Sequence, residues 1–349
     1  MKQNEKRRMP AEWEQQTMVQ LTWPHNGTDW KPYLDEIVKT MTEMAVAIAE
    51  HEKLLIVTPN TEETSMMLKR QMSEKQWRNT KFFECETNDT WARDHAFITV
   101  AEDDGTGCDC KLKLLDFHFN GWGMKFEASK DNAINSKMAE SGIVGGVRED
   151  NDDFVLEGGS IESDGCGTVF TTTSCLLAPH RNQPMDREQI ETELKCRLGA
   201  SRIIWLNHGN LIGDDTDGHI DTIVRIAPED TLLYVKCSDE GDEHYEDFMA
   251  LEKELKLLKT ADGKAYRLIP LPFPKAIYDS DGERLPATYA NYLIINGAVL
   301  VPTYNQPEMD KEACEIIGKA FKDREIIPFD SRVIIRQHGS IHCLTMQYY

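Results

Sequence analysis

Residues 220–269 of the chain read IDTIVRIAPEDTLLYVKCSDEGDEHYEDFMALEKELKLLKTADGKAYRLI. Two runs of β-branched and apolar residues, Ile220–Ile226 and Thr231–Lys236, predict a pair of strands. Apolar residues spaced three and four apart predict a helix over Asp242–Leu258, and Ala265–Ile269 predicts a third strand after it. The stretch therefore predicts a unit of strand, strand, helix and strand.

The same order of elements is predicted along the rest of the chain. Further helices are predicted at Pro32–Glu50, Ala133–Ser141, Asp186–Leu198 and Asp310–Phe321. Strand-like runs occur at Leu54–Val57, Arg202–Trp205 and Glu325–Pro328, and a strand pair is predicted for Ile98–Val100 with Leu112–Phe117. About five such units fit into the 349 residues.

No linker rich in Pro, Gly or Ser divides the sequence, so we expect residues 1–349 to form a single domain. A parallel sheet of βαβ units is the alternative architecture. It is disfavoured because no Gly-x-Gly-x-x-Gly pattern follows a first strand and because the helices do not alternate with single strands. We therefore expect cyclic repetition of a small α/β unit.

The composition is that of an acidic, folded protein. The chain has 60 Asp and Glu against 39 Lys and Arg, a net charge of −21 at pH 7, and 40% of its residues are hydrophobic. The apolar content excludes a wholly disordered chain. Negative charge of this size repels phosphate backbones, so we expect no nucleic-acid partner and favour a small cationic ligand.

Neither a membrane segment nor a secretion signal is expected. The longest apolar stretches, such as Tyr292–Pro302, are about ten residues long, whereas a membrane-spanning helix needs about 20. The charged N-terminus is followed by Pro10-Ala11-Glu12-Trp13-Glu14 rather than by an apolar run. The nine cysteines, an odd number at irregular spacings, fit reduced thiols in the cytoplasm better than a disulfide framework.

Five polar segments each follow the last strand of a predicted unit. They are Asn88–Asp94, Glu157–Gly159, Gly213–Asp221, Pro286–Asn291 and Gln337–Cys343. One such segment would be an ordinary loop. If the units are arranged in a ring, all five segments meet at its centre, which predicts a functional site there.

Cys343 and His219 are a candidate nucleophile and base. A thiol with a pKa of about 8.5 is mostly protonated at neutral pH, so a nucleophilic Cys343 needs a base elsewhere in the chain. We expect Cys343 in a strand-like frame, and we expect His219 and Asp221 on the same face of a strand, pointing into one cavity. The alternatives are an inert buried thiol and a core histidine beside a solvated aspartate.

Asp94 and Glu157 are two further candidates. Asp94 is either a carboxylate presented from the end of a strand or half of a surface ion pair with Arg93. Glu157 lies between an apolar run and a Gly-Gly turn, where a carboxylate either binds backbone or orients a catalytic histidine. No metal is expected, because Cys108-Asp109-Cys110 lacks a second Cys/His pair and no His-Glu-x-x-His occurs.

In this order, the motifs resemble those of the agmatine deiminase family, which is grouped with the Porphyromonas-type peptidylarginine deiminases in the guanidine-modifying superfamily. They are Trp91-x-Arg93-Asp94, Glu157-Gly158-Gly159, Gly218-His219-Ile220-Asp221 and Gly339-x-Ile341-His342-Cys343. The segments Met9–Glu14 and Leu21–Pro24 also match, so the resemblance covers essentially the whole chain. His95–Phe97 and Gln337–Ser340 depart from the commoner family pattern.

The resemblance implies a five-bladed α/β propeller with pseudo-fivefold symmetry, the pentein fold. It also implies that Cys343 attacks a guanidinium carbon and that His219 moves protons. Asp94 and Asp221 would grip the guanidinium nitrogens, and Glu157 would partner His219. Such hydrolysis through a Cys343 thiouronium adduct needs neither a cofactor nor a metal. Carboxylates beside Cys343 would raise its pKa, so we expect the thiolate to form mainly next to the cationic substrate or a protonated His219.

Agmatine is the expected substrate, and its product would be N-carbamoylputrescine. A dication without a carboxylate needs an anionic pocket, and we select Asp89 and Asp215 for it, with Asp214 nearby. We expect Trp91 and Trp122 to line the methylene chain of the substrate. The alternatives are a peptidylarginine or other guanidine deiminase and a non-catalytic ring-shaped binding protein. A Cys-His peptidase is disfavoured, because two carboxylates would repel an oxyanion. The sequence leaves a homodimer open.

Overall fold

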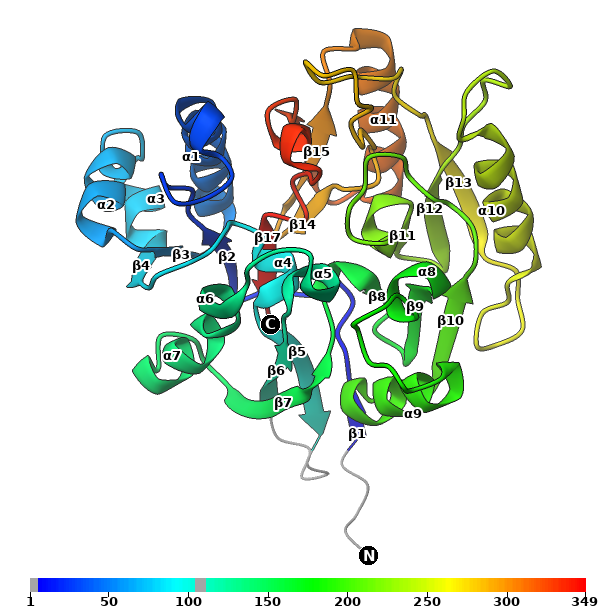
Figure 1. Cartoon of the computed structure of the whole chain (residues 1–349), viewed down its shortest axis with the longest axis horizontal. Coiled ribbons are helices and arrows are strands. Elements are labelled where there is room, and N and C mark those ends of the chain that lie inside the picture. The colour runs from blue at the N-terminus through cyan, green and yellow to red at the C-terminus, as the bar shows by residue number, and fades with distance from the viewer. Residues whose placement is uncertain (1–5, 104–110) are drawn as a thin grey trace, which may run out of the picture.

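The computed structural model describes residues 6–103 and 111–349, so the Cys108-Asp109-Cys110 motif lies outside the described residues. The strands form five separate sheets (Figure 1). Two sheets have four strands: β17 (Thr345–Tyr348), β2 (Met18–Thr22), β3 (Leu54–Thr58) and β4 (Thr80–Glu84); and β1 (Lys6–Arg8), β5 (Ile98–Asp103), β6 (Lys111–His118) and β7 (Val147–Val155). Three sheets have three strands: β10 (Arg202–Leu206), β9 (Thr168–Thr172) and β8 (Ile161–Ser163); β11 (Val224–Ala227), β12 (Thr231–Val235) and β13 (Arg267–Leu271); and β14 (Leu293–Ile295), β15 (Ala298–Thr303) and β16 (Glu325–Asp330).

Every sheet contains an antiparallel pair followed by a strand that joins in parallel. Examples are β11 with β12 and then β13, and β14 with β15 and then β16. A parallel neighbour requires a crossover of a dozen or more residues, usually a helix. The long crossover helices are α1 (Leu34–His51), α9 (Arg187–Leu198), α10 (Tyr245–Leu257) and α11 (Pro307–Ala320). The predicted unit of strand, strand, helix and strand is confirmed.

Shorter helices complete the connections. They are α2 (Thr61–Lys69), α3 (Glu74–Asn79), α4 (Ala92–His95), α5 (Gly121–Met124), α6 (Ser129–Asn132), α7 (Ile134–Ser141) and α8 (Thr173–Leu176). Four 3-10 turns are η1 (Lys31–Tyr33), η2 (Gly158–Ser160), η3 (Ile220–Thr222) and η4 (Ile334–Gln337). Among the helices of the described ranges, none combines the length and the apolar character that a transmembrane span requires.

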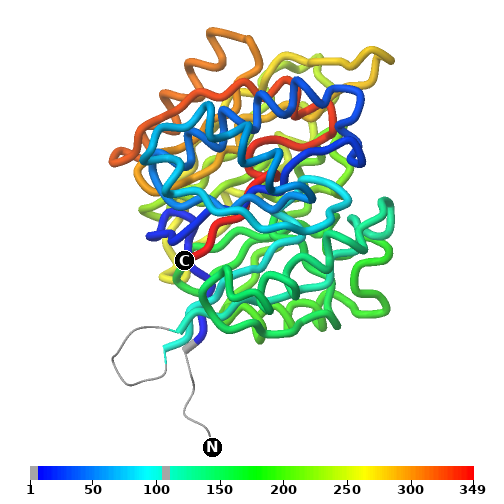
Figure 2. The backbone as a smooth tube through the Cα atoms, turned by 90° about the vertical axis from the view of Figure 1, so that its left-hand side faces the viewer, coloured from blue at the N-terminus to red at the C-terminus, as the bar shows by residue number. Residues whose placement is uncertain are grey.

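The last strand of the chain pairs with an early strand in one sheet. The C-terminal strand β17 pairs antiparallel with β2, with Tyr348 opposite Met18 and Thr345 opposite Leu21. In Figure 1 the five sheets lie around a common centre, and Figure 2 shows the red C-terminal segment beside the blue N-terminal one. The sheet that contains β2 is therefore completed only when the last residues of the chain fold back.

Apolar side chains hold neighbouring sheets together. Helix α1 buries Ile37, Met41 and Ile48 on one face, as its spacing of three and four predicts. These side chains belong to one apolar cluster with Leu293 and Leu300 of the neighbouring sheet. Removing such a buried side chain typically costs about 2–5 kcal/mol, so these clusters fix the relative positions of the sheets and of the segments between them.

One predicted strand is wrong in its first half. The strand expected over Ile220–Ile226 begins only at Val224, because Ile220–Thr222 forms the 3-10 turn η3. The Thr222 hydroxyl donates to the carbonyl of His219 at 2.8 Å and stabilises this tight turn. This difference changes how His219 and Asp221 are presented.

Candidate active site

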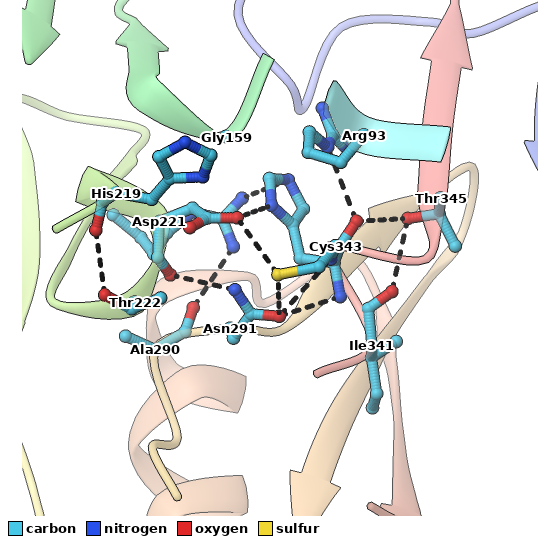
Figure 3. A network of polar contacts seen from close by, with 12 residues as sticks. Arg93, Gly159, His219, Asp221, Thr222, Ala290, Asn291, Ile341, Cys343 and Thr345 are labelled. Carbon is cyan, nitrogen blue, oxygen red and sulfur yellow. Dashed lines mark hydrogen bonds and ion pairs between the residues drawn. The ribbon is translucent and has the colours of Figure 1, made fainter. Parts of the chain in front are cut away.

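The five polar segments are the connections between successive sheets. Residues 85–97 lead from β4 to β5, 156–160 from β7 to β8, 207–223 from β10 to β11, 272–292 from β13 to β14, and 331–344 from β16 to β17. Each contributes to one cluster of side chains and backbone groups, which Figure 3 shows around the sulfur of Cys343. The predicted convergence of these segments is confirmed by the contacts described below.

Cys343 lies at the inner end of this cluster. Its Sγ is 3.5 Å from Oδ1 of Asn291 and 3.8 Å from Oδ2 of Asp221 (Figure 3). Asn291 Oδ1 also accepts the backbone N–H groups of His342 at 3.0 Å and of Cys343 at 3.4 Å. Asn291 therefore fixes the turn that carries the thiol, and Cys343 is in a turn before β17 rather than in the expected strand.

Asp221 faces the thiol from the connection formed by residues 207–223. Its Oδ2 accepts a 2.7 Å hydrogen bond from Nδ1 of His342, whereas its Oδ1 has no hydrogen-bond partner among the described residues. Burial opposes ionisation, but the hydrogen bond and charge of His342 lower the pKa of Asp221. Asp221 is therefore held as a carboxylate with one oxygen unused.

Asp94 approaches from another side, on the four-residue helix α4 rather than at the end of a strand. Its Oδ2 accepts from the indole Nε1 of Trp122 at 3.0 Å, and its Oδ1 accepts from the N–H of Gly159 at 3.0 Å. Burial, followed by the charges of Asp221 and Glu157, raises the pKa of Asp94 well above its ordinary value. The alternative of a surface ion pair with Arg93 is excluded, because both side chains are buried and Arg93 pairs with Glu12.

Gly159 shows how closely these groups surround one point. A Cβ atom at this position would lie 2.6 Å from Nδ1 of His219, 2.9 Å from Oδ1 of Asp94 and 3.2 Å from Oδ2 of Asp221. Real Cβ atoms essentially never approach another atom more closely than 3.0 Å. Glycine is therefore required where η2 passes the two carboxylates and the imidazole.

His219 is fully buried and lies directly before the turn η3. Its Nδ1 is 3.7 Å from Oδ1 of Asp94, and neither ring nitrogen has a hydrogen-bond partner among the described residues. Burial lowers the pKa of His219 to about 3, although Asp221 opposes this change. The imidazole is therefore neutral in this environment, with a lone pair available on one ring nitrogen.

Glu157 does not hydrogen-bond to His219 in this structure. Its Oε1 accepts from Nε of Arg181 at 2.8 Å, whereas its Oε2 has no partner among the described residues. Burial raises the pKa of Glu157 although Arg181 opposes the shift, and a carboxylate oxygen lies within 4.8 Å of a His219 ring nitrogen. Arg181 also pairs with Asp217 at 2.7 Å and so ties two of the five segments together.

Among the residues that the structure describes, two clusters hold side chains that are typical metal ligands, with candidate ligand atoms within 4.8 Å of one another. One consists of Glu157, Cys175 and His219, and the other of Glu12, Glu162 and His342. In each cluster an arginine already binds a carboxylate, Arg181 in the first and Arg225 in the second. A divalent cation would meet a guanidinium at both places, so neither donor set suits a metal.

A cavity of about 500 Å³ opens onto Cys343. The acidic residues of its lining are Asp29, Asp89, Asp94, Glu127, Asp131 and Asp215, and the tryptophans are Trp91 and Trp122. All four residues selected for the substrate tail therefore line it. Asp214 does not, because its carboxylate accepts the Thr216 hydroxyl and the N–H of Gly218 and shapes the loop. Two basic side chains, Lys125 and His338, also line the cavity.

The charges in this cavity depend on burial. Burial, with Asp29 adding to it, raises the pKa of Asp89 to about 7. Burial, Asp221 and Asp94 raise the pKa of Cys343 well above its ordinary value, in the expected direction. Asp89 and Cys343 therefore keep their protons to higher pH than their residue types suggest, and a cation bound beside them would favour the release of these protons.

Four residues of the cluster were not selected from the sequence. Asn291 lies in one of the five quoted segments, so only its individual role was missed. Arg181 lies between α8 and α9 and belongs to no recognisable sequence motif. His342 is part of a quoted motif, but the adjacent Cys343 was the residue selected from it. Glu12 belongs to the N-terminal segment, whose position at the centre no local pattern indicates.

The chain matches the family model described as Porphyromonas-type peptidyl-arginine deiminase over residues 8–348. It is 32% identical to the agmatine deiminase of Pseudomonas syringae pv. tomato over 361 aligned positions, which cover 97% of this chain and 94% of the relative.

Two solved structures extend this similarity. A protein from Porphyromonas gingivalis, described as a candidate arginine deiminase, superimposes with a TM-score of 0.91 at 47% identity and covers 98% of each chain. The substrate-bound Cys-to-Ser variant of C. jejuni agmatine deiminase superimposes with a TM-score of 0.89 at 38% identity, over 99% of this chain and 97% of that one.

Proposed function

The chain belongs to the Porphyromonas-type peptidyl-arginine deiminase family, and from this premise we propose that it is an agmatine deiminase. Agmatine and water become N-carbamoylputrescine and ammonia, so the enzyme is a hydrolase of a C–N bond in a linear amidine. The observation that carries the proposal is the position of the Cys343 thiol beside Asp221 at an acidic cavity. Asp94 lies close to Asp221, since both carboxylates surround Gly159. The five sheets around one centre support the five-bladed propeller with pseudo-fivefold symmetry.

A guanidinium fits between Asp94 and Asp221. It is planar and presents N–H groups that carboxylates accept in pairs. The unpartnered Oδ1 of Asp221 and the carboxylate of Asp94 would hold it in plane, so that Sγ of Cys343 approaches the carbon from one face. Such positioning can lower a barrier by several kcal/mol.

The covalent step begins with transfer of the thiol proton to neutral His219. The thiolate forms a C–S bond with the guanidinium carbon, and the protonated His219 returns the proton to one nitrogen of the tetrahedral adduct. The C–N bond breaks, ammonia leaves and an S-alkylthiouronium remains on Cys343. Glu157 is assigned to orient His219, which its unused Oε2 supports.

Water completes the reaction on the same side chains. His219 takes a proton from water as its oxygen bonds to the thiouronium carbon, and the C–S bond of the second tetrahedral adduct breaks. The released ureido product carries the water oxygen, and Cys343 regains its proton. The second proton of the water leaves with ammonia as ammonium, which carries away the positive charge of the guanidinium, so atoms and charges balance without any redox step.

The cavity favours agmatine over arginine. The tail of agmatine ends in an ammonium, for which Asp89 is the proposed partner with Asp29 beside it, and Asp215 is a second acidic lining residue. No arginine lines the cavity within the described ranges, and Lys125 already pairs with Asp217 at 2.8 Å. The carboxylate of arginine would therefore meet acidic groups, whereas Trp91 and Trp122 can contact the methylene chain.

The compartment is proposed from the thiols. The seven cysteines in the described part of the chain are all unpaired, which supports a reducing cytoplasm. The product is a carbamoylated diamine, which places the reaction in the formation of putrescine.

The experiment that tests the proposal compares three substrates. Agmatine, arginine and an arginyl peptide are incubated separately with the protein, and ammonia and the ureido product are measured. We expect turnover of agmatine, with Cys343→Ala as the inactive, folded control. Preferred turnover of arginine or of the peptide would overturn the substrate, and no turnover of any of them would favour the non-catalytic ring.

A further inference from the structure

The N-terminal segment 9–14 brings a carboxylate to the buried side of the site. Glu12 Oε1 lies 2.7 Å from Nε2 of His342, and Glu12 Oε2 accepts from Nη2 of Arg225 at 2.5 Å. Arg93 donates to Glu12 Oε1 at 3.1 Å. A residue near the start of the chain therefore contacts the residue directly before the nucleophile.

His342 is buried between two carboxylates. Its Nδ1 is 2.7 Å from Oδ2 of Asp221, and its Nε2 is 2.7 Å from Oε1 of Glu12. A carboxylate supplies no proton to a hydrogen bond, so each ring nitrogen must carry one. The two carboxylate contacts therefore favour an imidazole that donates from both ring nitrogens and so carries a positive charge.

The surrounding charges fit a cation at this position. Three carboxylates, those of Glu12, Glu162 and Asp221, accompany two guanidinium groups, those of Arg93 and Arg225. One positive charge is missing, and the imidazolium supplies it. Nε2 of the imidazole also lies 3.1 Å from Nη2 of Arg225, but the Glu12 oxygen is closer, at 2.7 Å, and favours the form in which Nε2 donates.

We propose that Glu12 and His342 are positioning residues, which keep Asp221 ionised and fixed in the empty enzyme so that it is ready for the guanidinium. This inference rests on the proposed function, because the guanidinium-binding role of Asp221 is part of it. The ion chain runs from Glu12 through His342 to Asp221 and ends 3.8 Å from the sulfur of Cys343.

The two guanidinium-binding carboxylates thereby differ before substrate arrives. His342 lowers the pKa of Asp221 against the effect of burial, whereas Asp94 receives only the neutral donors Trp122 and Gly159 and its pKa is raised. One carboxylate is thus charged in advance, and the other is left to ionise with the substrate. Two buried carboxylates that were both charged would repel each other across the empty site.

The other groups around Asp221 do not replace His342. Three neighbouring titratable groups supply no positive charge to Asp221. Burial lowers the pKa of His219 and keeps it neutral, the raised pKa of Cys343 keeps the thiol protonated, and Asp94 is a carboxyl group. Arg225 lowers the pKa of Asp221 only through its charge, since its guanidinium binds Glu12 and Glu162. Loss of the imidazolium would therefore leave Asp221 without a hydrogen-bonded cation.

The first experiment measures kcat/KM for agmatine against pH in His342→Gln and Glu12→Gln. Glutamine can donate one hydrogen bond to Asp221 but carries no charge, so the pKa of Asp221 should rise and the acidic limb should move to higher pH. We expect the pKa of Asp221 to rise by about one unit in His342→Gln, so that activity on the acidic limb, where Asp221 takes up its proton, falls about tenfold more than activity at pH 8.5. Glu12→Gln should shift the limb in the same direction by less.

Glu14→Gln is the matched control, because Glu14 lies two residues away and pairs with Arg8 instead. Its pH profile should superimpose on that of the parent. An equal loss at every pH in His342→Gln, or an unmoved acidic limb, would overturn the proposal and leave only a structural role.

The second experiment does not depend on catalysis, so the two proposals can fail separately. In protein labelled with ¹⁵N-histidine, the spectrum of the parent should show one histidine with both ring nitrogens protonated at pH 8. This signal should be absent in His342→Gln and should lose one ring proton at pH 8 in Glu12→Gln. A neutral tautomer in the parent would overturn the inference even if agmatine is turned over, and an inactive parent that retains the imidazolium would overturn only the proposed function.

Discussion

At the scale of single residues, the site combines a thiol that is protonated at rest with carboxylates that differ in charge. Cys343 lies near Asp221 and Asp94, both of which raise its pKa beyond the effect of burial. The thiol is therefore a poor nucleophile until a cation neutralises its surroundings. This arrangement couples activation of the nucleophile to binding of the correct class of substrate.

Alkylation of Cys343 by iodoacetamide should accordingly depend steeply on pH. Because its pKa is raised, the thiolate fraction is small at neutral pH and should increase about tenfold per pH unit up to at least pH 9. Mass spectrometry of the modified peptide gives the rate, with an exposed thiol, Cys196, as the internal control. A rate for Cys343 that is constant between pH 6 and pH 8 would contradict this expectation.

Replacement of Asp89 should reveal which end of the cavity binds the amine. Asp89→Asn removes the charge that faces the tail, so KM for agmatine should rise about tenfold or more while kcat changes little. A guanidine with the same chain length but without the amine should be turned over equally by the variant and the parent. If Asp215→Asn raises KM for agmatine and Asp89→Asn does not, the amine binds at Asp215 instead.

At the scale of elements, the connections between sheets contain only short helical elements where they reach the site. Helix α4 and the turns η2 and η3 are each only three or four residues long, and they present backbone N–H groups and side chains within one small volume. Longer elements could not pass each other so closely. Gly159 in η2 is the clearest case, because its missing side chain leaves room for Asp94, His219 and Asp221.

Gly159→Ala should therefore abolish most activity. The added methyl group would lie 2.6 Å from His219 Nδ1, so either the imidazole or a carboxylate must move. A displacement of this size can cost about 10²-fold in kcat/KM. Gly145→Ala is the control, since its Cβ would meet nothing within 4 Å. Retained activity in Gly159→Ala would show that the groups need not be held at these distances.

At the scale of the whole molecule, segments from near both ends of the chain come together. Strand β17 pairs with β2, and Tyr348 donates to Gln20 at 2.6 Å across this pair. The N-terminal segment crosses to the same place, where Glu12 binds Arg93, Arg225 and His342. Residues from both ends therefore meet next to the nucleophile.

Deletion of residues 345–349 should destabilise the whole fold rather than one edge. The deletion removes the antiparallel partner of β2 and the contacts of Met346 and Tyr348 with their apolar cluster, so we expect a much lower Tm and no activity. Tyr348→Phe removes a single hydrogen bond and should cost only about 1 kcal/mol. Thermal unfolding followed by circular dichroism distinguishes the two, and a truncated chain with an unchanged Tm would show that the fold does not need β17.

The sequence by itself determined the repeated unit, the five polar segments and the main chemical groups. Apolar spacing located the long helices, because helices and strands obey short-range periodicity, and Cys343, Asp94 and His219 stood in recognisable motifs. The local backbone at His219, Asp221 and Cys343 was predicted as strand, but tertiary hydrogen bonds bend it into turns.

Only the tertiary structure decided which groups pair. Glu157 binds Arg181, His342 lies between Asp221 and Glu12, and Asn291 holds the turn of the nucleophile. These partners are separated by between 24 and 330 positions along the chain, so no local pattern encodes their contacts. Charge balance in a buried volume depends on which side chains the folded sheets bring together, and that is fixed by packing over the whole ring.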